Sequence, residues 1–217
     1  MVRLRESLVA LSVLCACLAV ETRAGELNHD EAVAALFSAD AGARRDGAAW
    51  LGSNGGPADA DLVVEALHDD DERVRGAAEA AVWRLWSRSG DAQIDSLLQS
   101  GIHYMDDGRM GKAVEIFTQI TVRKPEFAEG WNKLATAYYL IGDYDESLKD
   151  CDEVIKRNPN HFGALSGYGL IYVKRGDLER ALEYFQKALD VNPNLHGVEE
   201  TIDLIRYKLG KEGKQDT

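Results

Sequence analysis

The stretch AEGWNKLATAYYLIGDYDESLKDCDEVIKRNP, Ala128–Pro159, contains two apolar-periodic segments of about 13 residues each. Gly142 separates the two segments, and glycine is the residue that most readily ends a helix with a left-handed turn. Pro159 closes the second segment because proline cannot continue a helix interior. The stretch therefore predicts a hairpin of two helices.

The same punctuation recurs along the chain with a period of 34 residues. The residues in phase are Pro125, Pro159 and Pro193; Gly108, Gly142 and Gly176; and Tyr104, Tyr138 and Tyr172. Three residue types that repeat at one period indicate an array of equivalent units. We therefore expect three stacked hairpins, at about 92–125, 126–159 and 160–193.

These hairpins resemble the tetratricopeptide repeat (TPR) family over residues 92–195. The middle repeat carries Trp131, Leu134, Tyr138, Gly142 and Pro159 at the signature spacing. The third carries Gly169, Tyr172, Ala181, Phe185, Ala188 and Pro193, and the first carries Tyr104, Ala113, Phe117 and Pro125. The resemblance implies an all-α fold, a right-handed α-solenoid of helical hairpins.

The resemblance also implies a concave groove, lined by the first helix of each hairpin, that binds a partner peptide or helix. Its expected lining residues are Leu98, Ile102, Met105, Asn132, Thr136, Tyr139, Ser166, Leu170 and Val173. For Ile102 and Leu170, packing against neighbouring helices remains an equal alternative. TPR proteins that clamp the acidic C-terminus of cytosolic chaperones use lysine, arginine and asparagine residues on this face. The matching positions here are Leu98, Ile102, Lys133, Gly163 and Gly167, so the resemblance implies no such clamp.

After Pro193, the residues Val198, Ile202, Ile205 and Leu209 share one face of a single helix. We expect residues 196–211 to cap the last hairpin, because solenoids need a terminal unit with a polar outer face. Residues 212–217 are expected to form a flexible tail.

Residues 28–90 are also helical by pattern. A shift of 31 aligns Leu36 with Leu67, Arg44 with Arg75, and Ala49 with Ala80, and the second copy resembles a HEAT-type repeat. We expect this HEAT-like pair to continue into the TPRs as one solenoid of about eleven helices, with Trp83 and Trp86 packed against the first TPR hairpin.

The N-terminus has the pattern of a secretory signal peptide, residues 1–24. Arg3 and Arg5 precede the apolar run Leu8–Val20, and Ala24 is small. The apolar run is shorter than the roughly 20 residues that a membrane-spanning helix needs. An alternative is lipidation of Cys17 in "LCAC", and another is a buried N-terminal helix. Export to a bacterial periplasm, or secretion, is the expected localisation.

Composition and charge exclude several function classes. The net charge is −12, with 12 acids against 6 bases in residues 28–90 and 22 against 16 in residues 91–217. Nucleic acids and anionic membranes need a concentrated basic surface, so neither is an expected partner.

The sequence after the leader carries no motif for catalysis or for cofactor binding. The five histidines lie far apart, and His161 and His196 follow prolines, as turn residues do. Cys151, which aligns with Phe117 and Phe185, is expected to be a buried core residue with an inert thiol. We therefore predict no enzyme, no cofactor and no metal site.

The leading prediction is an exported TPR adaptor or scaffold that holds a protein partner in its groove. One alternative is a structural subunit of a cell-envelope complex, docked through its outer face or its tryptophan-rich N-terminal helices. Another is a metal-binding protein or enzyme that uses scattered acids and histidines.

Overall fold

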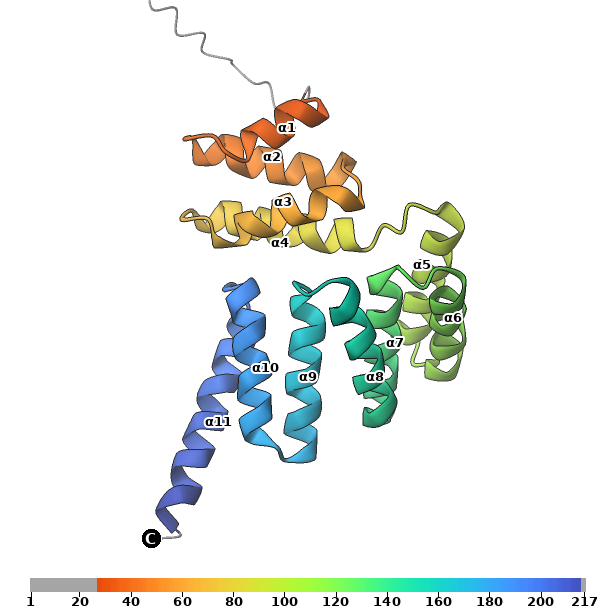
Figure 1. Ribbon diagram of the computed structural model, residues 1–217, viewed down its shortest axis with the longest axis vertical. Coiled ribbons are helices and arrows are strands. Elements are labelled where there is room, and N and C mark those ends of the chain that lie inside the picture. Colours follow the sequence, from red (N-terminus) through yellow and green to blue (C-terminus); the bar gives the residue numbers. More distant parts are fainter. Residues whose placement is uncertain (1–26, 216–217) are drawn as a thin grey trace, which may run out of the picture.

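The computed structural model describes residues 27–215, which form eleven α-helices, two short 3₁₀ turns and no strand (Figure 1). The expected leader, including Cys15 and Cys17, lies outside the described residues, as do residues 216–217 at the end of the expected tail. An all-α architecture of helical hairpins is therefore confirmed.

The first part of the fold, residues 29–86, is called here the N-terminal layer. Its elements are α1 (His29–Ala35), α2 (Ala41–Asn54), η1 (Pro57–Asp59), α3 (Ala60–Glu65), η2 (Ala66–His68) and α4 (Glu72–Trp86). Three hairpins follow, made of α5 (Ala92–Asp106) with α6 (Met110–Arg123), α7 (Ala128–Ile141) with α8 (Tyr144–Arg157), and α9 (Phe162–Arg175) with α10 (Leu178–Val191).

The turns inside the second and third hairpins follow from a glycine and the aspartate after it. Gly142 and Gly176 adopt φ of 83° and 77°, which a side chain would strain, and they end α7 and α9. Asp143 and Asp177 come next, and each carboxylate accepts a hydrogen bond from a backbone N–H in the first turn of α8 or α10. Each first helix of these hairpins therefore stops, and the second starts, within two residues.

The last helix, α11 (His196–Gln215), covers the end of the hairpin stack. Ile202 and Ile205 are buried against Phe185 and Ala181 of α10. The helix extends beyond residue 211 to Gln215, so residues 212–215 of the expected tail are helical.

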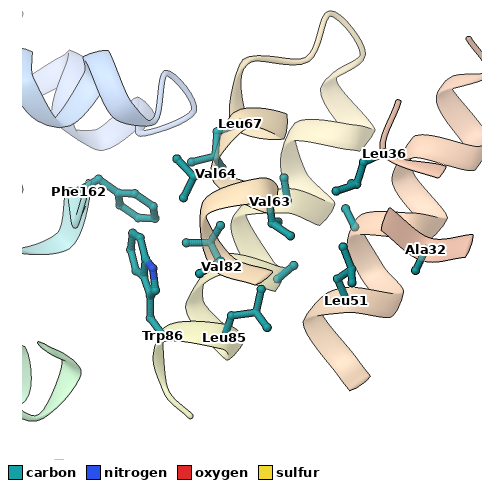
Figure 2. Close-up of a cluster of buried hydrophobic side chains, with 14 residues drawn as sticks. Ala32, Leu36, Leu51, Val63, Val64, Leu67, Val82, Leu85, Trp86 and Phe162 are labelled. Carbon is teal, nitrogen blue, oxygen red and sulfur yellow. The ribbon is translucent and has the colours of Figure 1, made fainter. Parts of the chain in front are cut away.

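Contrary to expectation, the aromatic residues of the N-terminal layer pack against the third hairpin and not against the core of the first. Figure 1 shows α4 lying across the ends of α9 and α10. Figure 2 shows Phe162, the first residue of α9, beside Trp86 within the core of the layer. The expected contact of Trp83 and Trp86 with the first TPR hairpin is therefore wrong: both rings contact His161 and Phe162 instead.

The connection between α4 and α5 explains this placement. Arg88 donates to the carbonyl oxygens of Gly52 and Ser53, at 2.8 Å each, and so binds the connection to the end of α2. Gly90, at φ 78°, then turns the chain away from the layer. The third repeat places the aromatic ring of Phe162 at the edge of the layer's hydrophobic core. Burial of apolar rings there favours the observed contact.

Arg44 and Arg75 make equivalent contacts, as their 31-residue shift suggests. Each guanidinium donates to two carbonyl oxygens five and six residues before it and to one side chain later in the chain. The partners are Ser38, Ala39 and Asp69 for Arg44, and Asp69, Asp70 and Asn194 for Arg75. Asn194 lies in the loop after α10, so the end of the third TPR supplies the acceptor that Asp69 supplies to Arg44.

Candidate functional site

The site lies where α7 and α9 run side by side, with α8 packed against both helices (Figure 1). Small side chains allow this close approach. The Ser147 hydroxyl of α8 donates to the Ala135 carbonyl of α7 at 2.8 Å, and both residues are buried. A side chain of α8 therefore contacts the backbone of α7 directly, and a small cavity remains next to this contact.

This cavity, called here the groove pocket, has a volume of about 130 Å³. Its lining consists of Asn132, Ala135, Thr136 and Tyr139 of α7, Ser147 and Cys151 of α8, and Gly163, Ala164, Ser166, Gly167 and Leu170 of α9. Five of the nine expected groove residues thus lie around one cavity: Asn132, Thr136, Tyr139, Ser166 and Leu170.

The other four expected residues lie elsewhere. Leu98 is fully buried in the core of the first hairpin. Ile102 and Met105 are partly buried against the same core, and Val173 packs on the cluster that joins α10 to α11. The pocket therefore belongs to the second and third repeats.

The pocket exists because the middle repeat carries small residues where its neighbours carry phenylalanine. In the first and third repeats, Phe117 and Phe185 lie against Gly101 and Gly169, and a methyl group on either glycine would come within 2.5 Å of the ring. The middle repeat pairs Cys151 with an alanine at the glycine position. A thiol fills far less space than a benzyl group, so a cavity opens over Cys151.

Burial, aided by Asp150 and Asp152, raises the pKa of the Cys151 thiol to about 12. The thiol therefore stays protonated at neutral pH, and thiolate is the reactive form. The expected buried, inert cysteine is confirmed in its burial, since its exposed fraction is 2%.

A buried ion-pair network lies next to Asn132, which lines the pocket. The Glu129 carboxylate is fully buried; its Oε2 lies 3.0 Å from both Asn132 Nδ2 and His161 Nε2, and its Oε1 lies 2.9 Å from Lys133 Nζ. Burial opposes ionisation, but the hydrogen bond from His161 and the Lys133 charge outweigh it and hold the pKa of Glu129 below its ordinary value. Glu129 is therefore an anion at neutral pH.

The hydrogen bonds fix the tautomer of His161. Its Nδ1 accepts from the Ala164 backbone N–H at 3.1 Å and so caps α9, which leaves Nε2 to carry the proton that Glu129 accepts. Trp86 stacks on the imidazole at a centroid distance of 4.4 Å, and Trp83 meets it edge-on. The N-terminal layer thereby covers the buried pair.

Trp83 lies against Gly163, which lines the pocket. A methyl group on Gly163 would lie 2.6 Å from the Trp83 ring, and Lys133 Nζ lies 6.0 Å from the ring centroid. The layer therefore lies against the start of α9, next to the groove pocket.

Sequence reasoning missed Glu129, His161 and the glycines of α9 as parts of the site. The repeat period held one signal: His161 aligns with Phe127 and Leu195, both apolar. A polar residue in an apolar phase of a repeat needs a buried partner. The period does not name that partner, because Glu129 aligns with Asp95 and Gly163.

A larger crevice, of about 510 Å³, lies between the N-terminal layer and the loops joining the repeats. Its cations are already paired: Arg88 with carbonyl oxygens, Lys124 with Glu126, and Arg157 with Glu153. The groove pocket, which is smaller and largely apolar, is the better candidate for holding a side chain of a partner.

Two further observations, on metal-binding groups and on membrane-spanning helices, concern residues 27–215. No group of three or more histidine, cysteine, aspartate or glutamate side chains is placed there to hold a metal ion. In the same range, no helix combines the length and apolar character needed to cross a bilayer.

A tetratricopeptide-repeat family model matches residues 126–194, which contain the second and third hairpins and the groove pocket. Residues 126–194 are therefore similar to the tetratricopeptide repeat family. A curated TPR repeat-containing protein of Rhizobium etli is 32% identical over 124 residues, which cover 57% of this chain and 61% of that relative. The chain thus spans less than two thirds of that relative's length.

Solved TPR structures share the fold. The first TPR domain of Spaghetti (RPAP3), bound to the HSP90 peptide SRMEEVD, superposes with a TM-score of 0.53 at 21% identity and covers 55% of this chain and 96% of that domain. MamA superposes with a TM-score of 0.51 at 23% identity and covers 65% of this chain and 84% of MamA. At these identities the likeness establishes the fold of the TPR region alone.

Proposed function

We propose that this TPR protein is a non-catalytic adaptor that holds a segment of a partner protein in its concave groove. The observation that carries the proposal is the convergence of five expected groove residues on one largely apolar pocket. The fold is shared with a TPR domain whose structure contains a bound peptide, which supports the same use here.

Site-specific photo-crosslinking in native extracts tests this proposal. A photoreactive residue at Thr136 or Ser166, beside the pocket, should give a discrete crosslinked product. The matched control is Gln186, which is exposed on α10, away from the pocket. Asn132→Ala and Tyr139→Ala should weaken the crosslink from Ser166. Equal products from Gln186 and from the groove positions would contradict groove binding.

The alternative is a structural subunit of an envelope complex docked through the outer face or the tryptophan-rich helices. Trp86 is 9% exposed and already packs against His161, so it offers little surface to a partner. A product from Gln186 alone, with none from Thr136 or Ser166, would favour this alternative.

We further propose that the protein is exported by its first 24 residues to the periplasm or beyond. The proposal rests on the charge and apolar pattern of the leader. Mass spectrometry of the native protein should find an N-terminus near Gly25. A lipid-modified Cys17 would replace this model with a membrane-anchored one, and an intact Met1 would contradict export.

We also propose that α1–α4 form a degenerate HEAT-like pair. The equivalent contacts of Arg44 and Arg75 support a duplicated unit of 31 residues. Arg44→Ala and Arg75→Ala should therefore destabilise the layer by similar amounts, measured by urea unfolding; a loss from only one of them would count against the duplication.

A further inference from the structure

Asn132 and Thr136 of α7 line the pocket, and each already donates a side-chain hydrogen bond within the chain. Asn132 Nδ2 donates to Glu129 Oε2 at 3.0 Å, so the amide is turned with its oxygen, Oδ1, away from that carboxylate. The Thr136 hydroxyl donates to the Asn132 carbonyl at 2.8 Å. Because an ionised carboxylate only accepts, Glu129 fixes the amide in this orientation.

The charges at the same place cancel. Lys133 is the one basic residue at the positions where a carboxylate clamp would need cations, and Glu129 binds its ammonium at 2.9 Å. The Glu129 side chain is fully buried and that of Lys133 is 22% exposed. A chain-terminal carboxylate placed here would lose its hydration and meet no uncompensated cation.

We propose that the groove pocket takes one uncharged aliphatic side chain from an internal segment of the partner, whose backbone N–H donates to Asn132 Oδ1, and that Glu129 determines this specificity. The proposal rests on groove binding as proposed above and names the chemistry of the partner. The volume agrees, since a cavity of about 150 Å³ holds one benzene molecule and a leucine-sized group is comparable.

The test uses small probes and NMR spectroscopy of the isotope-labelled full chain. N-acetyl-leucine methylamide carries the side chain and neutral amides, N-acetyl-leucine carries the same side chain with a carboxylate, and the peptide SRMEEVD is acidic. The signals followed are the backbone N–H groups of Gly163 and Gly167 and the side-chain amide of Asn132. The methylamide should shift all three, N-acetyl-leucine should bind at least about threefold more weakly, and SRMEEVD should shift none of them.

Glu129→Gln tests the role of the buried charge. Glutamine can still accept from His161 and Asn132 but no longer neutralises Lys133, so N-acetyl-leucine should now bind about threefold to tenfold more tightly than in the wild type. Glu129→Gln combined with Lys133→Met should lose that gain. If Glu129→Gln gives no gain while its spectrum remains that of a folded protein, Glu129 does not set the specificity.

Two variants keep the test decisive if Glu129→Gln fails to fold. Asn132→Leu removes the acceptor at similar volume and should weaken methylamide binding about threefold to tenfold. Ala135→Gly with Cys151→Phe installs the glycine–phenylalanine pair of the neighbouring repeats, fills the pocket and should abolish binding. Unchanged binding in either variant overturns the proposal.

The outcomes also separate the two proposals. Wild-type protein that binds N-acetyl-leucine or SRMEEVD as tightly as the methylamide would overturn the specificity and leave groove binding intact. Wild-type protein in which no probe shifts the groove signals would contradict groove binding by this pocket, and the specificity with it.

Discussion

At position 151 the middle repeat carries a thiol where the first and third carry benzyl rings, and this difference creates the pocket. The cluster of acids around Cys151 has separate structural roles: Asp143 caps α8, and Asp152 accepts a hydrogen bond from Tyr168. Asp150 differs from both, because its Oδ2 is buried without a hydrogen-bond partner.

Asp150 makes stability depend on pH. Burial, followed by the nearby carboxylates Glu146 and Glu153, raises its pKa to about 7. The folded protein therefore keeps a proton that the unfolded chain loses near pH 4, so this residue lowers stability as the pH rises from about 4 to about 7. Asp150→Asn should be more stable than the wild type by about 2–4 kcal/mol above pH 7 and equal to it below pH 4.

Urea unfolding at pH 4, 5.5 and 8 measures this difference. Asp61→Asn, which changes an exposed acid of α3, is the matched control and should show no comparable trend. A difference between Asp150→Asn and wild type that stays constant over the three pH values would contradict the assignment.

At the scale of one element, α11 has two apolar sides with different surroundings. Ile202 and Ile205 are 3% and 6% exposed, whereas Leu204 and Tyr207 are 70% and 64% exposed. The period of 34 places Leu204 and Tyr207 in register with Leu170 and Val173, so the outer side of α11 repeats the groove-facing positions of α9.

Substitutions on the two sides of α11 should therefore differ. Ile202→Ala removes a fully packed side chain and should cost about 2–5 kcal/mol of unfolding free energy. Leu204→Ala, on the exposed side of the same helix, is the matched control. It should change the unfolding free energy by less than about 0.5 kcal/mol. Guanidinium unfolding compares the two, and equal losses would show that α11 does not cap the stack through Ile202.

At the scale of the whole molecule, the N-terminal layer and the repeats share one interface. It combines the stacking of Trp86 on His161 with the hydrogen bond from Arg75 to Asn194 at 2.7 Å. Both contacts join residues more than 70 positions apart, so we expect the two parts to unfold together.

Cooperative unfolding can be followed by two signals. Three of the four tryptophans, Trp50, Trp83 and Trp86, lie in the layer, while far-UV circular dichroism reports all helices. The two unfolding curves should coincide in the wild type. Trp86→Ala with Arg75→Ala should separate them into two transitions, and two transitions already present in the wild type would refute the coupling.

The sequence by itself determined the hairpins and five residues of the pocket. These follow from local causes: the glycines that end α7 and α9, the aspartates that start α8 and α10, and the 34-residue period. The leader, residues 1–24, remains a prediction from the sequence alone.

Only the tertiary structure decided what lies against the repeats. The burial of Glu129 with His161, the contact of Trp83 with Gly163 and the docking of Arg75 on Asn194 each join segments far apart in the chain. No period encodes such pairs, because the two partners occupy different phases of the repeat or belong to different parts of the fold. Their free energy comes from burying rings and satisfying buried polar groups, which depends on which surfaces meet once the chain has folded.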